Sequence, residues 1–119
     1  MTAQRLSRSF RITRAIEIRA LMTQGKRRRT DHLDLFTRPS PVGCSRLAVV
    51  VARGRHTAVH RNLLRRRLRE FGRRAVLPAL VAATDVLVRA RREAYQAGFE
   101  TLRQEFVGSL CPPSRDSAS

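Results

Sequence analysis

The sequence is poor in acidic residues. Nine Asp and Glu residues stand against 25 Lys and Arg residues, which gives a formal net charge of +16 at pH 7. This excess is larger than solubility requires, and its self-repulsion destabilises the folded chain unless a polyanion neutralises it. Nucleic acid is the first candidate for such a partner, and an acidic membrane surface is the other polyanion to consider.

Lysine is almost absent as well. Lys26 is the only lysine among the 25 cations. The planar guanidinium of arginine suits bidentate phosphate contacts and stacking on bases, which favours a nucleic-acid partner. A GC-rich genome would produce the same arginine bias, and the residues alone leave both explanations open.

Long apolar stretches and clustered metal ligands are missing too. No stretch approaches the ~18 apolar residues of a membrane-spanning helix, and the basic segment 1–14 lacks the apolar core of a secretory signal. Cys44 and Cys111 lie far apart, without a Cys or His cluster near either of them, so we expect free thiols and no metal site. We therefore expect a cytoplasmic protein without a membrane partner.

Catalytic constellations are equally scarce. The sequence contains no convincing acid/base pair or nucleophile triad, and its three histidines, His32, His56 and His60, are scattered. Scattered histidines are more often incidental than catalytic. We therefore expect no catalytic side chain in this chain.

What is present is the pattern of one small α+β domain. A chain of 119 residues has room for one ordinary domain, which we place at 11–111, between a flexible basic arm at 1–10 and a disordered tail at 112–119. Hydrophobic periodicity predicts the order αββαβα, a small two-layer sandwich with helices on a short sheet. The expected elements lie at 14–24, 32–38, 46–52, 58–76, 85–91 and along a final helical stripe from Tyr95 to Leu110.

The fourth of these elements is a helix rich in arginine, which begins AVHRNLLRRRLRE. At 100° per residue its apolar side chains form one stripe that docks on the sheet. Only Glu70 offers an acid within the helix, so salt bridges do not explain the arginines, and phosphates explain them better than a merely soluble surface does. The helix forms a βαβ crossover if the strands that flank it are parallel. The stripe consists of Leu64, Leu68, Phe71 and Ala75.

This helix and its flanking segments resemble a known family. The run AVHRN..RRRLRE follows an apolar strand and precedes DVLVRAR at 85–91, and RITRAIEIRALMTQGKR at 11–27 looks like a first helix with a closing Gly-Lys-Arg. In this order, from about Arg11 to Leu110, the segments resemble the protein component of bacterial ribonuclease P. The resemblance implies an RNA–protein enzyme that removes the 5′ leader from precursor tRNA, with the active site and its Mg²⁺ ions in a large RNA subunit.

The resemblance also implies partners and contacts. The partners would be the catalytic ribonuclease P RNA and precursor tRNA, with no obligate protein partner, and the domain at 11–111 would be RNA-binding. The family's crossover around the arginine helix is left-handed, against the usual rule. The RNA contacts carried over from the family lie on the arginine helix: Arg61, Asn62, Arg65, Arg66 and Arg69. We expect the same RNA-binding surface to continue to Arg73 of this helix and, on neighbouring basic loops, to Lys26, Arg27, Arg28, Arg29 and Arg53.

A second site implied by the resemblance is a cleft between the sheet and the first helix. In the family it accepts the single-stranded leader, partly through aromatic side chains, which suits sequence-tolerant stacking. Phe36 occupies an aromatic position of this cleft, whereas Ile18, Met22 and Val86 stand where aromatic residues are common. We expect weaker stacking on the leader, compensated by packing and by arginine.

Other departures and one alternative remain. Leu63 stands where the family has the third residue of an Arg-Asn-Arg motif, and His56-Thr57 replaces the usual Gly-Asn. The alternative is a small basic ribosomal or other structural RNA-binding protein, which composition alone would favour. A DNA-binding regulator is a weaker alternative because a valine-rich strand, and not a helix and tight turn, precedes the arginine helix, and an autonomous nuclease is weaker still.

Overall fold

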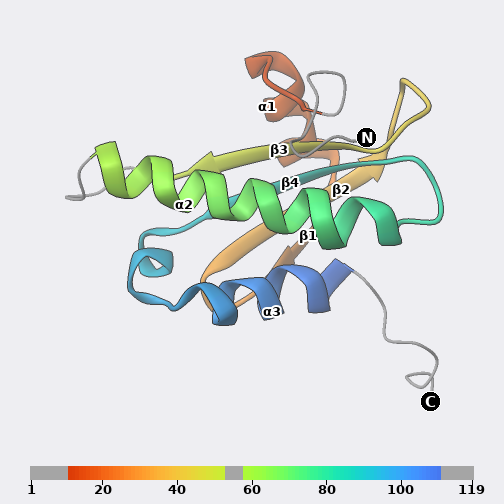
Figure 1. Ribbon diagram of the computed structural model, residues 1–119. Coiled ribbons are helices and arrows are strands. Elements are labelled where there is room, and N and C mark those ends of the chain that lie inside the picture. The colour runs from red at the N-terminus through yellow and green to blue at the C-terminus, as the bar shows by residue number, and fades with distance from the viewer. Residues whose placement is uncertain (1–10, 53–57, 111–119) are drawn as a thin grey trace.

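A computed structural model describes residues 11–52 and 58–110, and in these residues three α-helices accompany a four-stranded sheet (Figure 1). The predicted α+β class is confirmed. The predicted arm at 1–10, the tail at 112–119, Arg53 and His56-Thr57 lie outside the described residues. The main elements are α1 (Ala15–Gln24), β1 (Lys26–Arg29), β2 (Leu33–Pro39), β3 (Arg46–Val51), α2 (Ala58–Phe71), β4 (Thr84–Ala90) and α3 (Phe99–Leu110).

The strand β1 is absent from the predicted order. Its sequence KRRR, expected on a loop, pairs antiparallel with β2 at the edge of the sheet. Four consecutive cations show no alternation of apolar and polar residues, so the sequence carries no strand signal. The strand forms because β2 offers backbone hydrogen bonds, and an outer strand tolerates charge on every side chain. The order of the main elements is therefore αβββαβα.

The sheet has the strand order β1-β2-β4-β3. β4 pairs antiparallel with β2 and parallel with β3. Because β3 and β4 are parallel neighbours joined through α2, they form the βαβ crossover that the sequence left conditional. The left-handed sense implied by the family resemblance stays a prediction.

Helices cover both faces of the sheet, whereas the expected two-layer sandwich has them on one face. α2 and α3 lie on one face (Figure 1), over the larger core, which contains Leu68 and Phe106. α1 contacts β2 and β4 over a smaller core, which contains Leu21. Side chains alternate between the faces of a strand, so Val86 belongs to the larger core and its neighbour Leu87 to the smaller one.

The buried positions of α2 recur every four residues. Leu64 and Leu68 are buried, and so are Gly72 and Val76 in the π-helical turn that continues the helix to Val76. Side chains four residues apart drift around an ordinary α-helix of 3.6 residues per turn, and the wider π turn returns Val76 to the sheet. The last two positions of the predicted stripe, one residue before Gly72 and Val76, are therefore only half-buried.

Candidate RNA interface

The outer face of α2 carries arginines without carboxylate partners. Among the described residues, no carboxylate lies within ion-pair distance of Arg65, Arg66 or Arg69. Asn62 accepts a hydrogen bond from the Arg65 guanidinium, with 2.9 Å between Oδ1 and Nη1. Asn62 and Arg66 are exposed, and Arg61 is half-buried. The structure thus brings the predicted helix residues together on one acid-poor surface.

Arg65 and Arg69 also line a cavity that the sequence pattern does not reveal. With Arg11 they surround a space of about 190 Å³ between α2 and the segment that leads into α1. Burial, and then the positive charges of Arg11 and Arg65, lower the pKa of Arg69 from its ordinary value. The buried Nε atom of Arg11 has no hydrogen-bond partner. An anion in this cavity would reduce the repulsion among the three guanidinium groups.

Arg11 reaches this cavity by a backbone contact. It forms an isolated parallel bridge with Leu47 of β3, and the amide of Ile12 donates a hydrogen bond to the Leu47 carbonyl over 2.8 Å. No spacing in the sequence links Arg11 to a helix that begins almost fifty residues later, at Ala58. Only the tertiary fold brings Arg11 to the cavity that Arg65 and Arg69 line.

Other arginines of this region have partners within the chain. The Nη2 atoms of Arg73 and Arg74 lie 3.6 and 3.9 Å from Oε2 of Glu70. The Arg67 guanidinium lies 5.0 Å from the centroid of the Phe99 ring in α3, within the range of a cation–π interaction. Arg73 is therefore a weaker candidate for an RNA contact than Arg65 and Arg69, which have no carboxylate partner among the described residues.

The basic run 26–29 lies at a different edge from α2. It forms β1, and β2 and β4 separate it from β3, the strand that α2 contacts. The expectation that these cations occupy loops beside the arginine helix is therefore wrong. The error arises because the crossover through α2 is built on β3, whereas β1 pairs only with β2.

The structure brings together three of the four residues predicted for the leader cleft. Ile18 and Met22 of α1 pack against a core that contains Phe36 of β2. Phe36 is only 4% exposed, and the Arg27 guanidinium lies 5.8 Å from the centroid of its ring. The Phe36 ring therefore supports the surface from below, while Ile18, Met22 and Arg27 are more accessible.

Val86 does not belong to this cleft. It is fully buried in the larger core, on the face that α2 and α3 cover. The residue of β4 that faces α1 is Leu87. Strand side chains alternate with a period of two, so an assignment that is off by one residue places a side chain on the wrong face.

A fully buried carboxylate organises the basic side chains near α1. Asp85 accepts hydrogen bonds from Nε and Nη2 of Arg46 at 3.0 and 2.9 Å and from Nε of Arg38 at 3.3 Å. Glu17 of α1 lies 3.6 Å from Nη1 of Arg46. The hydrogen bonds to Asp85 outweigh burial and raise the pKa of Arg46. This network joins α1 to the sheet and neutralises the arginines that it contains.

Asp34 has a similar role at the other end of the same face. It is buried, and its Oδ1 accepts a hydrogen bond from Nη1 of Arg91 at 2.9 Å. Arg27 and Arg29 of β1 lie 3.5 and 3.9 Å from the same oxygen. Sequence analysis did not single out Asp34 or Asp85, although a lone carboxylate within an apolar strand is a recognisable signal of a buried ion pair.

His32 takes part in a structural contact. With Thr30 it binds the carboxylate of Glu105, which joins α3 to the turn between β1 and β2. Burial would raise the pKa of Glu105, but the hydrogen bonds from Thr30 and His32 outweigh it and lower this pKa. Across 11–52 and 58–110 no group of three or more His, Cys, Asp or Glu side chains could hold a metal ion. No helix in those ranges is long and apolar enough to cross a membrane.

Comparisons with known proteins converge on one family. The model of the family Ribonuclease P matches residues 6–111. A ribonuclease P protein component of Desulfovibrio desulfuricans is 34% identical over 102 residues, which covers 82% of this chain and 76% of that protein. One from Picosynechococcus is 28% identical over 101 residues, with 84% and 86% covered.

Solved structures show the same fold. The RNase P protein of Staphylococcus aureus has a TM-score of 0.73 at 22% identity, with 87% of this chain and 95% of that chain covered. The RNase P protein of Thermotoga maritima has a TM-score of 0.68 at 25% identity, with 91% and 96% covered. The likeness extends over nearly the whole of each chain.

Proposed function

The chain belongs to the ribonuclease P protein family, and from this premise we propose that it helps a catalytic RNA to remove the 5′ leader from precursor tRNA. It is a subunit of the ribonuclease P holoenzyme and a partner of the ribonuclease P RNA. The observation that carries the mechanism is the cavity of Arg11, Arg65 and Arg69, which has three guanidinium groups and no carboxylate.

In this proposal the two faces of the sheet bind different RNAs. The exposed side of α2, with Arg65, Arg66 and Arg69, binds phosphates of the folded RNA subunit, and each contact releases counterions. The surface beside α1 binds the leader through Ile18, Met22 and Arg27, over a floor that Phe36 supports. Apolar and cationic contacts of this kind tolerate many sequences, as a leader site requires.

The chemistry of cleavage belongs to the RNA subunit in this proposal. Mg²⁺ takes oxygen ligands, mostly carboxylates and phosphates, and the two buried carboxylates among the described residues, Asp34 and Asp85, bind arginines instead. The chain therefore contributes by binding and orienting RNA. By neutralising phosphates it lowers the Mg²⁺ concentration that the folded RNA needs.

The test is cleavage of a leader-bearing precursor tRNA by the ribonuclease P RNA of the same organism at limiting Mg²⁺, with and without this protein. We expect stimulation of cleavage at the correct position, and none by the protein alone. Exposed Arg103, which pairs with Glu100 over 3.4 Å, provides a control, because Arg103→Gln should stimulate as the unmodified chain does. Failure to stimulate would contradict the proposed role in leader removal, and the RNA retained from a lysate would then be identified.

A further inference from the structure

We propose that the cavity between β1 and the end of α3 binds one phosphate-bearing nucleotide of a single-stranded RNA. This site lies at the sheet edge formed by β1, away from the cavity of Arg11, Arg65 and Arg69. It needs no RNA subunit, so it can be tested on the protein alone.

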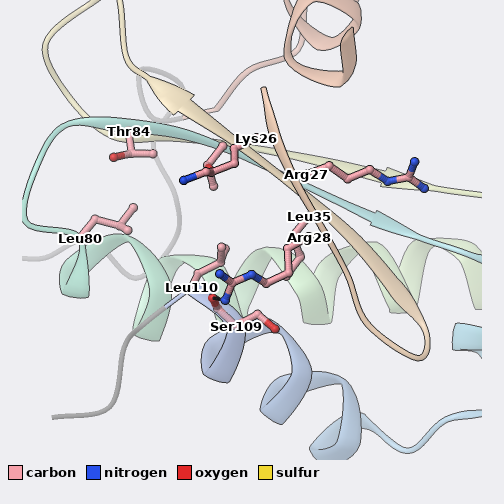
Figure 2. A pocket seen from close by; sticks show the side chains of 9 residues that line it. Lys26, Arg27, Arg28, Leu35, Leu80, Thr84, Ser109 and Leu110 are labelled. Carbon is pink, nitrogen blue, oxygen red and sulfur yellow. Dashed lines mark hydrogen bonds between the residues drawn. The ribbon is translucent and has the colours of Figure 1, made fainter. Parts of the chain in front are cut away.

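The alternation of β1 divides its four cations between the two faces of the sheet. Lys26 and Arg28 stand opposite Thr37 and Leu35 of β2, and Leu35 belongs to the larger core beneath α2 and α3. Lys26 and Arg28 therefore face α3. Figure 2 shows Arg27 directed away from the other side chains that line the cavity.

The two pairs of β1 cations, one on each face of the sheet, differ in whether a carboxylate lies near them. Arg27 and Arg29 lie within 3.5 and 3.9 Å of Asp34, whereas no carboxylate in the described part of the chain lies within ion-pair distance of Lys26 or Arg28. Nη1 of Arg28 donates a hydrogen bond to the carbonyl of Ser109 at 2.6 Å, which holds the guanidinium at the mouth of the cavity. Cations on an edge strand protect it against aggregation, but that role requires neither the cavity nor the ordered guanidinium.

The lining of the cavity combines phosphate donors with an apolar wall. Its volume is about 300 Å³, the lower end of the range for ligand sites, so it is large enough for one nucleotide. The Lys26 ammonium and the remaining nitrogens of Arg28 are donors for phosphate oxygens, and the leucines offer apolar surface for a base. Beside the three cations of β1, the lining contains Leu35, Thr37, Leu80, Thr84, Ser109 and Leu110 (Figure 2).

Single-stranded RNA fits this lining better than a folded duplex. In a duplex the bases are stacked and only the phosphates and sugars reach a narrow cavity, whereas in a single strand an unstacked base reaches an apolar wall beside its phosphate. Single strands are usually bound by a positively charged groove that follows the backbone, together with side chains that contact the bases, most often aromatic ones. In this cavity leucines take the place of the aromatic side chains. The lining contains no acid, which disfavours a cationic ligand.

The experiment follows backbone amide signals by NMR in the full-length chain while an oligouridylate of about eight nucleotides is added. We expect the signals of Thr37, Thr84 and Leu110 to shift. Lys26→Gln should abolish these shifts and reduce the log–log salt slope of binding by about 0.7. Signals near Arg69 should respond to the RNA as in the unmodified chain.

The control variants distinguish binding in this cavity from a general effect of lowering the net charge of the protein. Arg92 is exposed and has no ion pair among the described residues, so Arg92→Gln removes one charge elsewhere and should leave the shifts intact. The Lys26 side chain makes no hydrogen bond or ion pair in the described part of the chain, so Lys26→Gln should keep the thermal unfolding temperature. Arg28→Lys, which keeps the charge and loses the contact with Ser109, should weaken the shifts without abolishing them.

Three results would overturn the proposal. The first is unchanged signals at Thr37, Thr84 and Leu110, and the second is shifts that persist in Lys26→Gln. The third is shifts that occur only in a chain truncated after Leu110, which would identify residues 111–119 as the occupant. Stimulation of precursor tRNA cleavage is measured in parallel, because it tests the holoenzyme function independently of this site.

Discussion

The two faces of the sheet hold their arginines in different ways. On the α1 face, Arg46 is bound by the fully buried carboxylate of Asp85. On the α2 side, Arg65 and Arg69 share a cavity with Arg11 and with no acid. An arginine bound to a buried carboxylate belongs to the fold and is already neutralised, whereas an arginine without an acid adds repulsion that only an external anion removes. The comparison separates arginines that build the fold from arginines that are available to RNA.

The helices on these faces are attached in different ways as well. α2 is attached by apolar packing through Leu64, Leu68 and the close approach of Gly72 to β3. α1 has an apolar contact through Leu21 and also the ion pair between Glu17 and Arg46. Substitutions in the attachment of either helix should therefore change stability, whereas substitutions of the arginines on α2 that have no acid partner should change RNA binding.

The largest effect is expected for Asp85→Asn. The substitution leaves the buried guanidinium of Arg46 without its carboxylate, and loss of one member of a buried ion pair costs about 3 to 5 kcal/mol. Urea unfolding measures the change. Glu100→Gln is the matched control, because its pair with Arg103 is exposed and should contribute less than about 1 kcal/mol. Equal losses for the two variants would contradict the structural role of Asp85.

A smaller loss of stability is expected for Gly72→Ala. A Cβ atom at this position would lie 2.5 Å from Cδ2 of Leu47, inside a packed core, and overpacking of this kind costs about 1 to 3 kcal/mol. The higher helix propensity of alanine, worth about 1 kcal/mol, offsets part of the loss. Combining the variant with Leu47→Val should recover stability, measured as a coupling energy in a double-mutant cycle. Additive losses would mean that the contact with Leu47 does not limit the position.

Arg65→Gln combined with Arg69→Gln should change binding and leave the fold intact. Neither side chain has a carboxylate partner among the described residues, so the unfolding free energy should stay the same or rise slightly as repulsion falls. The log–log salt dependence of binding to the ribonuclease P RNA should decrease by about 0.7 to 0.9 for each lost phosphate contact. An unchanged slope would place the RNA elsewhere on the molecule. Arg103→Gln serves as the charge-matched control.

Sequence analysis predicts best where periodicity and burial agree. The arginine helix and the strand at 85–91 carry strong patterns. The helix begins at Ala58 as expected and reaches Val76 through the π turn that follows α2, and β4 lies within one residue of the expected bounds. β1 carries no pattern because its strand pairing, and not its side chains, makes it a strand. The family resemblance assigns Val86 to the leader cleft, but the strand register puts Leu87 on the α1 face, and a shift of one residue along a strand exchanges the two faces.

The candidate RNA interface can be predicted from the sequence only in part, because some of its residues meet through tertiary contacts. Helical spacing places Arg65 and Arg69 on one side of α2, and this much follows from the sequence. The position of Arg11 depends on its bridge to Leu47, a contact between distant segments that no local pattern encodes. The neutralisation of Arg46 by Asp85 is likewise a tertiary contact, so sequence alone cannot separate neutralised arginines from unpaired ones.

The smallest effect concerns Glu105, which joins α3 to the turn between β1 and β2. Hydrogen bonds from Thr30 and His32 lower its pKa below the ordinary 4.5, so the unfolded chain binds more protons at this residue than the folded chain does. The contribution of Glu105 is therefore present above pH 4.5 and is lost as the pH falls through the lower folded pKa. Urea unfolding of Glu105→Gln at pH values on both sides of this window should show a weaker acid dependence than the unmodified chain, with exposed Glu100→Gln unchanged. An acid dependence identical in all three proteins would mean that α3 is attached by apolar packing alone.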